Sequence, residues 1–404
     1  MRDRLILILL LSFDLLTYGN ELFGAVVFKA LYFSLLIILY FYDLGPRFKL
    51  GMLKTKQDSF FHLCMLFLLM YFFRMFYDLY FENVFHSIYS NKITYFIIFL
   101  NSVILPLFFL KSLSLKKLDF NKLGLSLMYI LFFVLLFSFY RIITQGVDNI
   151  LAGRASANEN LDTISYGHLG LTLFFVSLSN YTNLKSNNFI RIVCIMFMLF
   201  GFFSMAMANS RSPIVALFFV ILYFAFASGK KKVIILFISF ILLVVYFINE
   251  INEVLISYGS LFVERIISSL TSNDLESVTS ERTVLFNLGI NEFFENPFLG
   301  SSFLIQSPYY RGAYYHNFII ESFASLGVFG GGLFCVLLLI TLRKCYMLIR
   351  LNKKYYFFCF LFLQYFVFSL FSRSMVALPV FWISVFMVNN IYAFEQKNKN
   401  SYIQ

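Results

Sequence analysis

Residues 189–232 read FIRIVCIMFMLFGFFSMAMANSRSPIVALFFVILYFAFASGKKK, and this stretch decides the fold. Two apolar runs, 189–208 and 213–228, are separated by a short polar turn. A helix needs about 20 mostly apolar residues to cross a bilayer, and each run is close to that length. Neither run alternates as the strand of a membrane barrel does. The stretch therefore predicts two antiparallel transmembrane helices joined by a tight turn.

The same pattern continues along all 404 residues, of which 60% are hydrophobic and 13% charged. A chain of this composition is too apolar to be a soluble protein. We expect an all-α, polytopic integral membrane helical bundle, with a single transmembrane domain over residues 1–404 and one long outer loop over about 250–315. About twelve transmembrane helices are predicted, near residues 5–18, 22–43, 60–80, 93–110, 123–143, 163–182, 189–208, 213–228, 233–249, 316–342, 355–371 and 376–394.

Lysine and arginine assign the two sides of the membrane. Most of the 32 lie at the N-terminus, in alternate loops and in the C-terminal tail. The positive-inside rule makes that side cytoplasmic, so both termini are expected there and the loop 250–315 outside. The net charge of +11 is then a topology signal, and no nucleic-acid partner is expected. The five cysteines avoid the outer loops, and no CxxC motif or histidine-rich cluster predicts a disulfide framework, a metal or a cofactor.

The basic residues that break the inside bias are mainly arginines, whereas those inside are mainly lysines. Because a guanidinium group binds phosphate or carboxylate with two parallel hydrogen bonds, this excess favours an anionic ligand at the outer face. Snorkelling to lipid headgroups and ordinary ion pairs remain the alternatives. The exceptions are Lys29, Arg74, Lys92, Arg141, Arg154, Arg211, Arg265, Arg282, Arg311 and Arg373.

Arg211 lies in the turn between the two runs quoted above, in Asn209-Ser210-Arg211-Ser212-Pro213. Pro213 suits the first turn of a helix and Ser212 is expected to cap it. The N-terminus of that helix points outward, so its free N–H groups and Arg211 together predict a phosphate site. A capped helix start with an incidental arginine is the alternative. Arg373, in Ser372-Arg373-Ser374, has the same placement before the last predicted span.

The outer loop ends in a tyrosine-rich stretch, Tyr309-Tyr310-Arg311-Gly312-Ala313-Tyr314-Tyr315-His316-Asn317. Tyrosine side chains such as those of Tyr314 and Tyr315 stack on sugar rings, although an interfacial aromatic belt gives the same pattern. His316 lies where a helix emerges into water, and histidine can accept a proton from an attacking hydroxyl. Glu321 follows Asn317 by one helical turn in an apolar setting, so an outer arginine is its expected partner.

A surface helix is predicted within the outer loop, at about 281–295. Ser280 can cap it, and Asn296-Pro297 ends it. Arg282 projects from its first turn. An apolar stripe on this helix is expected to lie on the bilayer or on the bundle, and consists of Val284, Leu285, Leu288 and Phe294.

Taken together, these segments resemble the O-antigen ligase/polymerase superfamily of bacterial envelope glycosyltransferases. The resemblance rests on three segments of the C-terminal half: 209–212; 280–282 continuing to 295–300; and His316-Asn317 followed by Glu321, Leu326-Gly327 and Gly330-Gly331. It implies transfer between undecaprenyl-diphosphate-linked glycans at the periplasmic face of the inner membrane, without a metal or cofactor.

In that scheme His316 activates the acceptor hydroxyl, and Arg211 and Arg282 offset the charge of the departing diphosphate. The expected substrate-binding residues are Arg154, Arg311, Arg373, Glu321, Asn317, Tyr314 and Tyr315. The expected partners are the lipid-linked glycan, membrane lipids and a chain-length regulator.

Within this superfamily, polymerases extend a lipid-linked glycan and ligases pass it to the lipid A-core. Arg154 and Gly170, and likewise Arg311 and Gly327, are separated by the same number of residues. Such arginine–glycine pairs resemble a pattern of the Wzy-type repeat-unit polymerases, and they favour polymerase over ligase. A lipid-linked oligosaccharide flippase is the alternative from another class. It would place charges near the bilayer midplane and often shows repeat symmetry, and neither is apparent in the sequence.

Overall fold

The computed structural model describes residues 2–12, 25–41, 59–85, 91–111, 113–144, 163–183, 188–257, 263 and 282–401. Every regular element within these ranges is a helix, as predicted. Seven of the helices described are long and apolar enough to cross a membrane, and the chain is a multi-pass membrane protein. Each of the twelve predicted spans contains a helix, while the full count of twelve crossings stays a prediction.

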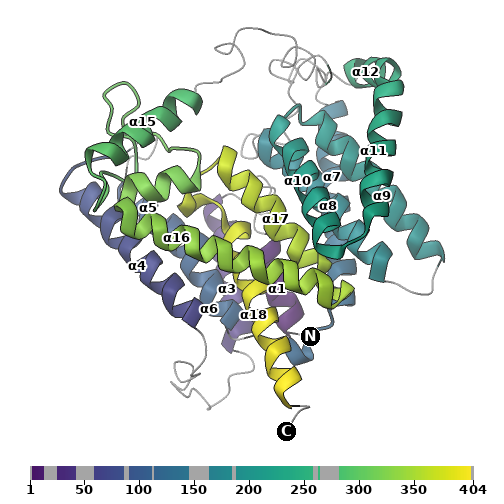
Figure 1. Cartoon of the computed structure of the whole chain (residues 1–404), viewed down its shortest axis with the longest axis horizontal. Coiled ribbons are helices and arrows are strands. Elements are labelled where there is room, and N and C mark those ends of the chain that lie inside the picture. Colours follow the sequence, from purple (N-terminus) through teal and green to yellow (C-terminus); the bar gives the residue numbers. More distant parts are fainter. Residues whose placement is uncertain are drawn as a thin grey trace. The chain divides into compact units, whose positions relative to one another are not determined.

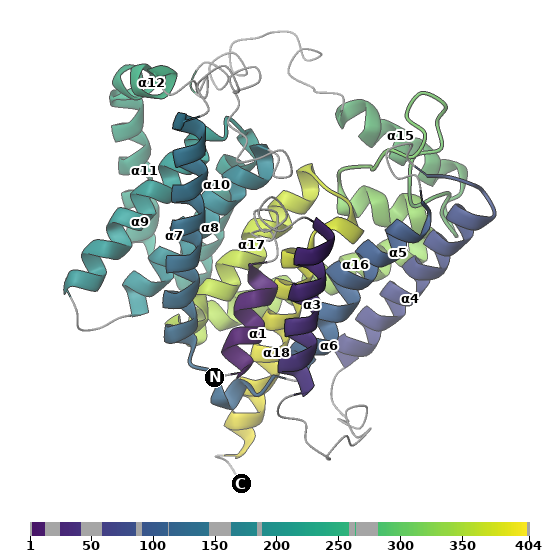
Figure 2. The ribbon, with the colours of Figure 1, turned by 180° about the vertical axis from the view of Figure 1, so that it is seen from behind.

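The chain divides into two compact units, which we describe separately (Figures 1 and 2). The first unit comprises residues 1–41, 112–273 and 345–368, and the second comprises 42–111, 274–344 and 369–404. The predicted single transmembrane domain stays a prediction.

The first unit is built mainly from helices that follow one another along the chain. They are α1 (Arg2–Leu11), α3 (Ala25–Phe41), the short η4 (Leu115–Lys117), α7 (Phe120–Thr144), α8 (Thr163–Asn183), α9 (Asn188–Met207), α10 (Arg211–Ser228), α11 (Lys231–Tyr246), α12 (Ile248–Ser257), the short η7 (Lys353–Tyr355) and most of α17 (Tyr356–Phe371). Figures 1 and 2 show α8 lying beside α7, α9 and α10, so α8 is the central helix of this group.

Glycine allows α8 and α9 to pack backbone against backbone. A Cβ added at Gly170 would lie 2.7 Å from the carbonyl oxygen of Gly201, and one added at Gly201 would lie 2.6 Å from that of Gly170. Neither position has room for a methyl group. Small residues are the usual means by which membrane helices approach this closely.

The second unit contains the helices of four predicted spans and the segment that joins α15 to α16. Its elements are α4 (Ser59–Tyr80), α5 (Ile93–Phe99), the π-helical turn η3 (Leu100–Ile104), α6 (Leu105–Lys111), α15 (Arg282–Glu295), most of α16 (Phe318–Leu351), η8 (Met375–Ala377) and α18 (Pro379–Ser401). α5, η3 and α6 form one continuous span, in which the π turn precedes Pro106. A π turn commonly absorbs such an irregularity in a helix.

The two ends of the second unit carry different basic residues. At one end, the ammonium group of Lys111 lies 3.9 Å from the ring centre of Phe61, and that of Lys344 lies 4.9 Å from the ring of Phe60. At the end where α4 finishes, Arg311 reaches the carbonyl oxygen of Glu82. Lys92 lies at the same end as Arg311, against Tyr80 and Asn83, and the sidedness inferred from the sequence stays a prediction.

The predicted surface helix forms as α15, Arg282–Glu295, and its proposed cap Ser280 lies outside the described residues. The predicted apolar stripe splits into two groups. Leu285 and Leu288 pack into a cluster with Ile305 and Tyr315, whereas Val284 and Phe294 are exposed. One face of α15 therefore packs against the second unit, and the face that carries Val284 and Phe294 is exposed.

Candidate active site

The start of α10 presents the arginine that the sequence singled out. Arg211 is the first residue of the helix and is exposed. Ser210 precedes it with extended backbone angles (φ −116°, ψ 134°), and the side chain of Ser210 forms no capping hydrogen bond. Arg211 forms no hydrogen bond or ion pair within the described part of the chain. Since the first N–H groups of a helix lack intrahelical partners, a cation and free donors lie together here.

Pro213 lies in the first turn of α10, as predicted, but the prediction that Ser212 caps the helix is wrong. Ser212 is buried inside the first turn, and its Oγ lies 3.0 Å from Nε2 of His168. The hydroxyl group of Ser212 is therefore bonded to His168 and does not cap the helix. Because His168 lies 44 residues earlier in the chain, the local sequence could not predict this partner. The turn also packs tightly on α8, because a Cβ at Gly167 would lie 2.8 Å from Pro213 and 2.9 Å from Ala208.

His168 was missed by the sequence reasoning, although a histidine within an apolar span is a signal in itself. Its side chain is fully buried and stacks on Phe368 with 4.0 Å between ring centres. Gln364 donates from Nε2 to the carbonyl oxygen of His168 (2.7 Å) and lies 2.9 Å from Oγ1 of Thr172. This polar cluster holds the turn that carries Arg211 on a fixed support.

The start of α16 is closed by Asn317. Its Oδ1 accepts hydrogen bonds from the N–H groups of Ile319 (3.0 Å) and Ile320 (3.1 Å), and its Nδ2 donates to the carbonyl oxygen of Leu370 (3.0 Å). Asn317 is therefore a helix cap and not a free substrate ligand. His316, just before the cap, is half-buried, and its ring lies 6.5 Å from that of Tyr314.

Glu321 is held by hydroxyl and amide donors, and no ion pair joins it to an arginine within the described ranges, which corrects the prediction. Its carboxylate is fully buried and accepts hydrogen bonds from the hydroxyl groups of Tyr71 and Ser374 (2.8 Å to the latter) and from the N–H group of Met375. Hydroxyl and amide donors satisfy a buried carboxylate as well as a cation does, so the apolar setting alone did not identify the partner. Glu321 thus ties α16 to the turn that carries Arg373.

Tyr315 lies in the core, so the prediction that it stacks on a sugar is wrong. Its side chain is fully buried, and its hydroxyl lies 2.5 Å from Oε2 of Glu292 and 3.0 Å from the carbonyl oxygen of Ser302. Burial raises the pKa of Glu292 and, more strongly, that of Tyr315. Tyr314 is half-buried, and Tyr309 is 94% exposed.

The segment 300–306 is held from two sides by buried carboxylates. Asp78 of α4 accepts the N–H group of Phe303 at 2.7 Å, and Glu292 of α15 accepts the N–H group of Gln306 at 2.8 Å. Arg74 pairs with Asp78 at 2.9 Å and approaches the carbonyl oxygen of Gly300 at 3.4 Å. Arg74, one of the outward arginines, is therefore part of the scaffold.

The remaining predicted arginines differ in exposure. Arg311 is exposed, with Nη2 3.4 Å from the carbonyl oxygen of Glu82, while Arg282 and Arg373 are half-buried. Arg154 lies outside the described residues. Arg211 belongs to the first unit, and the second unit contains His316, Arg282, Arg311 and Arg373. Among the described residues, no three His, Cys, Asp or Glu side chains gather to hold a metal.

Backbone strain concentrates in the same motifs. Within the described ranges, four residues other than glycine have positive φ: Asn83, Asn209, His316 and Arg373. Three of them, Asn209 (53°), His316 (56°) and Arg373 (69°), lie in the segments chosen from sequence. A non-glycine residue in this region costs of the order of 1–3 kcal/mol, and such strain clusters at functional sites.

The glycines of the motifs are explained by packing. Gly327 interrupts α16 with φ 62° and ψ −161°, and a Cβ there would lie 2.2 Å from the carbonyl oxygen of Phe298. The N–H group of Val328 donates to the carbonyl oxygen of Pro297 at 2.7 Å. The segment that follows α15 is thus seated in the break of α16. Gly327 and Gly170 are both explained by close backbone packing. The glycines of the two arginine–glycine pairs therefore do not have to contact a substrate.

Residues 196–335 match the family model described as O-antigen ligase. The matched region includes Arg211, Arg282, Arg311, His316 and the break at Gly327, whereas Arg154 and Arg373 lie outside it. A search of curated proteins finds no match to the chain. The family match supports a role in O-antigen-related glycan ligation or polymerisation. The resemblance predicted from the motifs is confirmed: the match of residues 196–335 to the O-antigen ligase family supports the O-antigen ligase/polymerase superfamily for this multi-pass membrane protein.

Proposed function

We propose that the protein polymerises undecaprenyl-diphosphate-linked oligosaccharide repeat units into O-antigen or capsule-type polysaccharide. The reaction takes place at the periplasmic face of the inner membrane, with both termini in the cytoplasm. The observation that carries the proposal is the open start of α10, where an exposed Arg211 stands beside a helix end that no side chain caps. A helix N-terminus with a guanidinium group is suited to a diphosphate.

The reaction is a displacement at the anomeric carbon of the donor glycan. The acceptor hydroxyl oxygen forms the new bond to that carbon, the bond from carbon to diphosphate oxygen breaks, and undecaprenyl diphosphate departs with the bonding electrons. His316 accepts the proton of the hydroxyl group and releases it to solvent. Arg211 and Arg282 stabilise the negative charge that develops on the leaving group. Inversion at the anomeric carbon follows from the single displacement.

Ligation to the lipid A-core is the second candidate, because the matching family model is described as O-antigen ligase. The two reactions share the donor and differ in the acceptor. The polymerase proposal is supported by the equal spacing of Arg154 from Gly170 and of Arg311 from Gly327, in which the arginines would bind substrate and the glycines serve packing.

A deletion strain separates the two candidates on one gel of surface polysaccharide. Loss of the polymerase leaves surface glycan that carries a single repeat unit. Loss of a ligase instead removes all attached glycan, and long lipid-linked chains accumulate. Normal chain lengths in the deletion strain would contradict both, and would favour a transporter whose task another protein can share.

A further inference from the structure

We propose that the first unit holds one acyl chain of an anionic phospholipid in an apolar cavity between α8, α10 and α17, with the lipid phosphate at Lys230 and Lys353. The proposal concerns a structural lipid and does not rest on the proposed reaction.

The cavity has a volume of about 410 Å³, within the roughly 300–1,000 Å³ of pockets that bind small ligands. Its wall is almost entirely apolar. Phe175 and Phe224 both lie against Phe360, with ring centres 5.2 and 5.3 Å from it, and they form an aromatic side of the cavity. An apolar wall of this kind suits a hydrocarbon chain and excludes a sugar or nucleotide.

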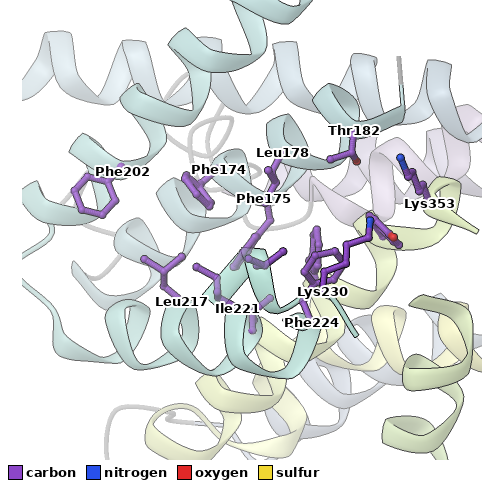
Figure 3. A pocket seen from close by; sticks show the side chains of 14 residues that line it. Phe174, Phe175, Leu178, Thr182, Phe202, Leu217, Ile221, Phe224, Lys230 and Lys353 are labelled. Atoms are coloured by element: carbon purple, nitrogen blue, oxygen red, sulfur yellow. The ribbon is translucent and has the colours of Figure 1, made fainter. Parts of the chain in front are cut away.

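Charge is confined to one end of the cavity. Figure 3 shows Lys230 and Lys353 together with Thr182 at one end, and Phe202 and Leu217 toward the other. Lys230 follows α10 and Lys353 precedes α17. Both side chains are exposed, and neither pairs with an acidic residue in the described ranges. Two cations at the mouth of an apolar cavity complement an anionic headgroup with an attached chain.

The length of the cavity also fits a lipid chain. The wall contributed by the α10 region runs from Leu217 to Lys230, which is about 20 Å at a rise of roughly 1.5 Å per residue. Half of a bilayer's hydrocarbon core is about 15 Å thick, so a chain from one leaflet occupies roughly three quarters of this length. The two lysines belong to the loops that the positive-inside rule assigns to the cytoplasm, whose leaflet is rich in anionic lipid.

Native mass spectrometry of the purified full-length protein tests the proposal, with phosphatidylglycerol and phosphatidylcholine as probes. The wild type is expected to retain phosphatidylglycerol in preference to phosphatidylcholine. The double variant Lys230→Gln/Lys353→Gln is expected to lose this preference by roughly ten- to thirty-fold, since each lysine near an anionic membrane surface contributes roughly five-fold. Lys116→Gln/Lys117→Gln removes the same charge from the exposed η4 turn of the same unit and is expected to change nothing.

A second variant keeps both lysines and fills the cavity. Leu178→Trp is expected to reduce retention of both phospholipids, because the larger side chain occupies the space of the acyl chain. Equal lipid preference in the two double lysine variants would overturn the proposal. Undiminished retention by Leu178→Trp, or stronger retention of undecaprenyl phosphate than of phosphatidylglycerol by the wild type, would also overturn it.

Discussion

The starts of α10 and α16 share the same backbone pattern but differ in how their first N–H groups are capped. Each helix is preceded by a non-glycine residue with positive φ, Asn209 in one case and His316 in the other, followed by the N-cap residue. At α16, the side chain of Asn317 satisfies the first N–H groups of its own helix. At α10, Ser210 leaves them uncapped and Arg211 is exposed.

This difference separates a scaffold at α16 from the proposed binding surface at α10. Around the start of α16, each buried carboxylate already has its donors within the second unit, as Glu321 shows. Around the start of α10, the buried groups serve only to support the turn, and the charged group faces outward. Apart from the proposed base His316, substitutions at the start of α16 should therefore affect stability, whereas substitution of Arg211 at the start of α10 should affect turnover.

The largest effect is expected from Gly327→Ala. The methyl group would meet the carbonyl oxygen of Phe298, and alanine is strained at φ 62° and ψ −161°. We expect loss of most folded protein, measured as monodisperse yield after detergent extraction. Gly332→Ala is the matched control on the same helix, because a Cβ there meets nothing within 4 Å. Equal yields from the two variants would show that the break in α16 is dispensable.

Arg211→Ala is expected to lower polymer formation by roughly 10²–10³-fold, the typical cost of removing a group that stabilises a developing oxyanion. The thermal unfolding temperature should stay that of the wild type, because Arg211 contacts no described partner. Arg211→Lys should also be poor, since an ammonium group cannot replace bidentate contact. The measurement is chain length in a complemented deletion strain.

The control for this experiment is Arg350→Ala, which removes an exposed arginine at the end of α16 and should leave chain length unchanged. Wild-type activity of Arg211→Lys would remove the bidentate argument. A fall in unfolding temperature for Arg211→Ala would remove the contrast with α16.

His316→Asn should reduce turnover by roughly 100-fold, because it removes the proposed base. Asparagine tolerates positive φ, so the backbone at 56° is kept, whereas His316→Ala would add strain to the loss of the base. Turnover in isolated membranes and the unfolding temperature of the purified protein separate the two effects. Full activity of His316→Asn would reduce His316 to a residue that shapes the turn.

The smallest effect is expected from Glu321→Gln, which should cost about 1–3 kcal/mol of stability by leaving buried donors poorly matched. Activity should fall only as far as the amount of folded protein falls. Glu295→Gln, at an exposed position on α15, is the matched control and should change neither quantity. A loss of turnover in fully folded Glu321→Gln protein would return Glu321 to the substrate site.

Local patterns predicted the helices well, because apolar length and proline position act within one segment. The spans, the turn at Pro213 and the bounds of α15 were all accessible in this way. The partners of Ser212, Tyr315 and Glu321 were not, because each is bonded to a residue far away in the chain. A polar residue in an apolar span signals that a partner exists, and only the fold shows which one.

The strained positions were also inaccessible. Asn209 and Arg373 belong to motifs chosen for their side chains, and the positive φ of each is visible only in the structure. The role of Gly327 was hidden for the same reason, since the atoms that exclude a methyl group belong to Pro297 and Phe298. The sequence shows the spacing of Gly327 within its motif, and only the structure shows that the packing of residues 297–298 requires a glycine there.

The anchoring of residues 300–306 by Asp78 and Glu292 has an entropic consequence. Fixing the backbone of a free segment costs about 1–2 kcal/mol of conformational entropy per residue. In residues 300–306 this entropy is already lost when the protein folds. A glycan that binds against this segment meets a wall that is already ordered, so binding does not have to immobilise it. Association should then show a small heat-capacity change, unlike the large change of a lid that folds over its substrate.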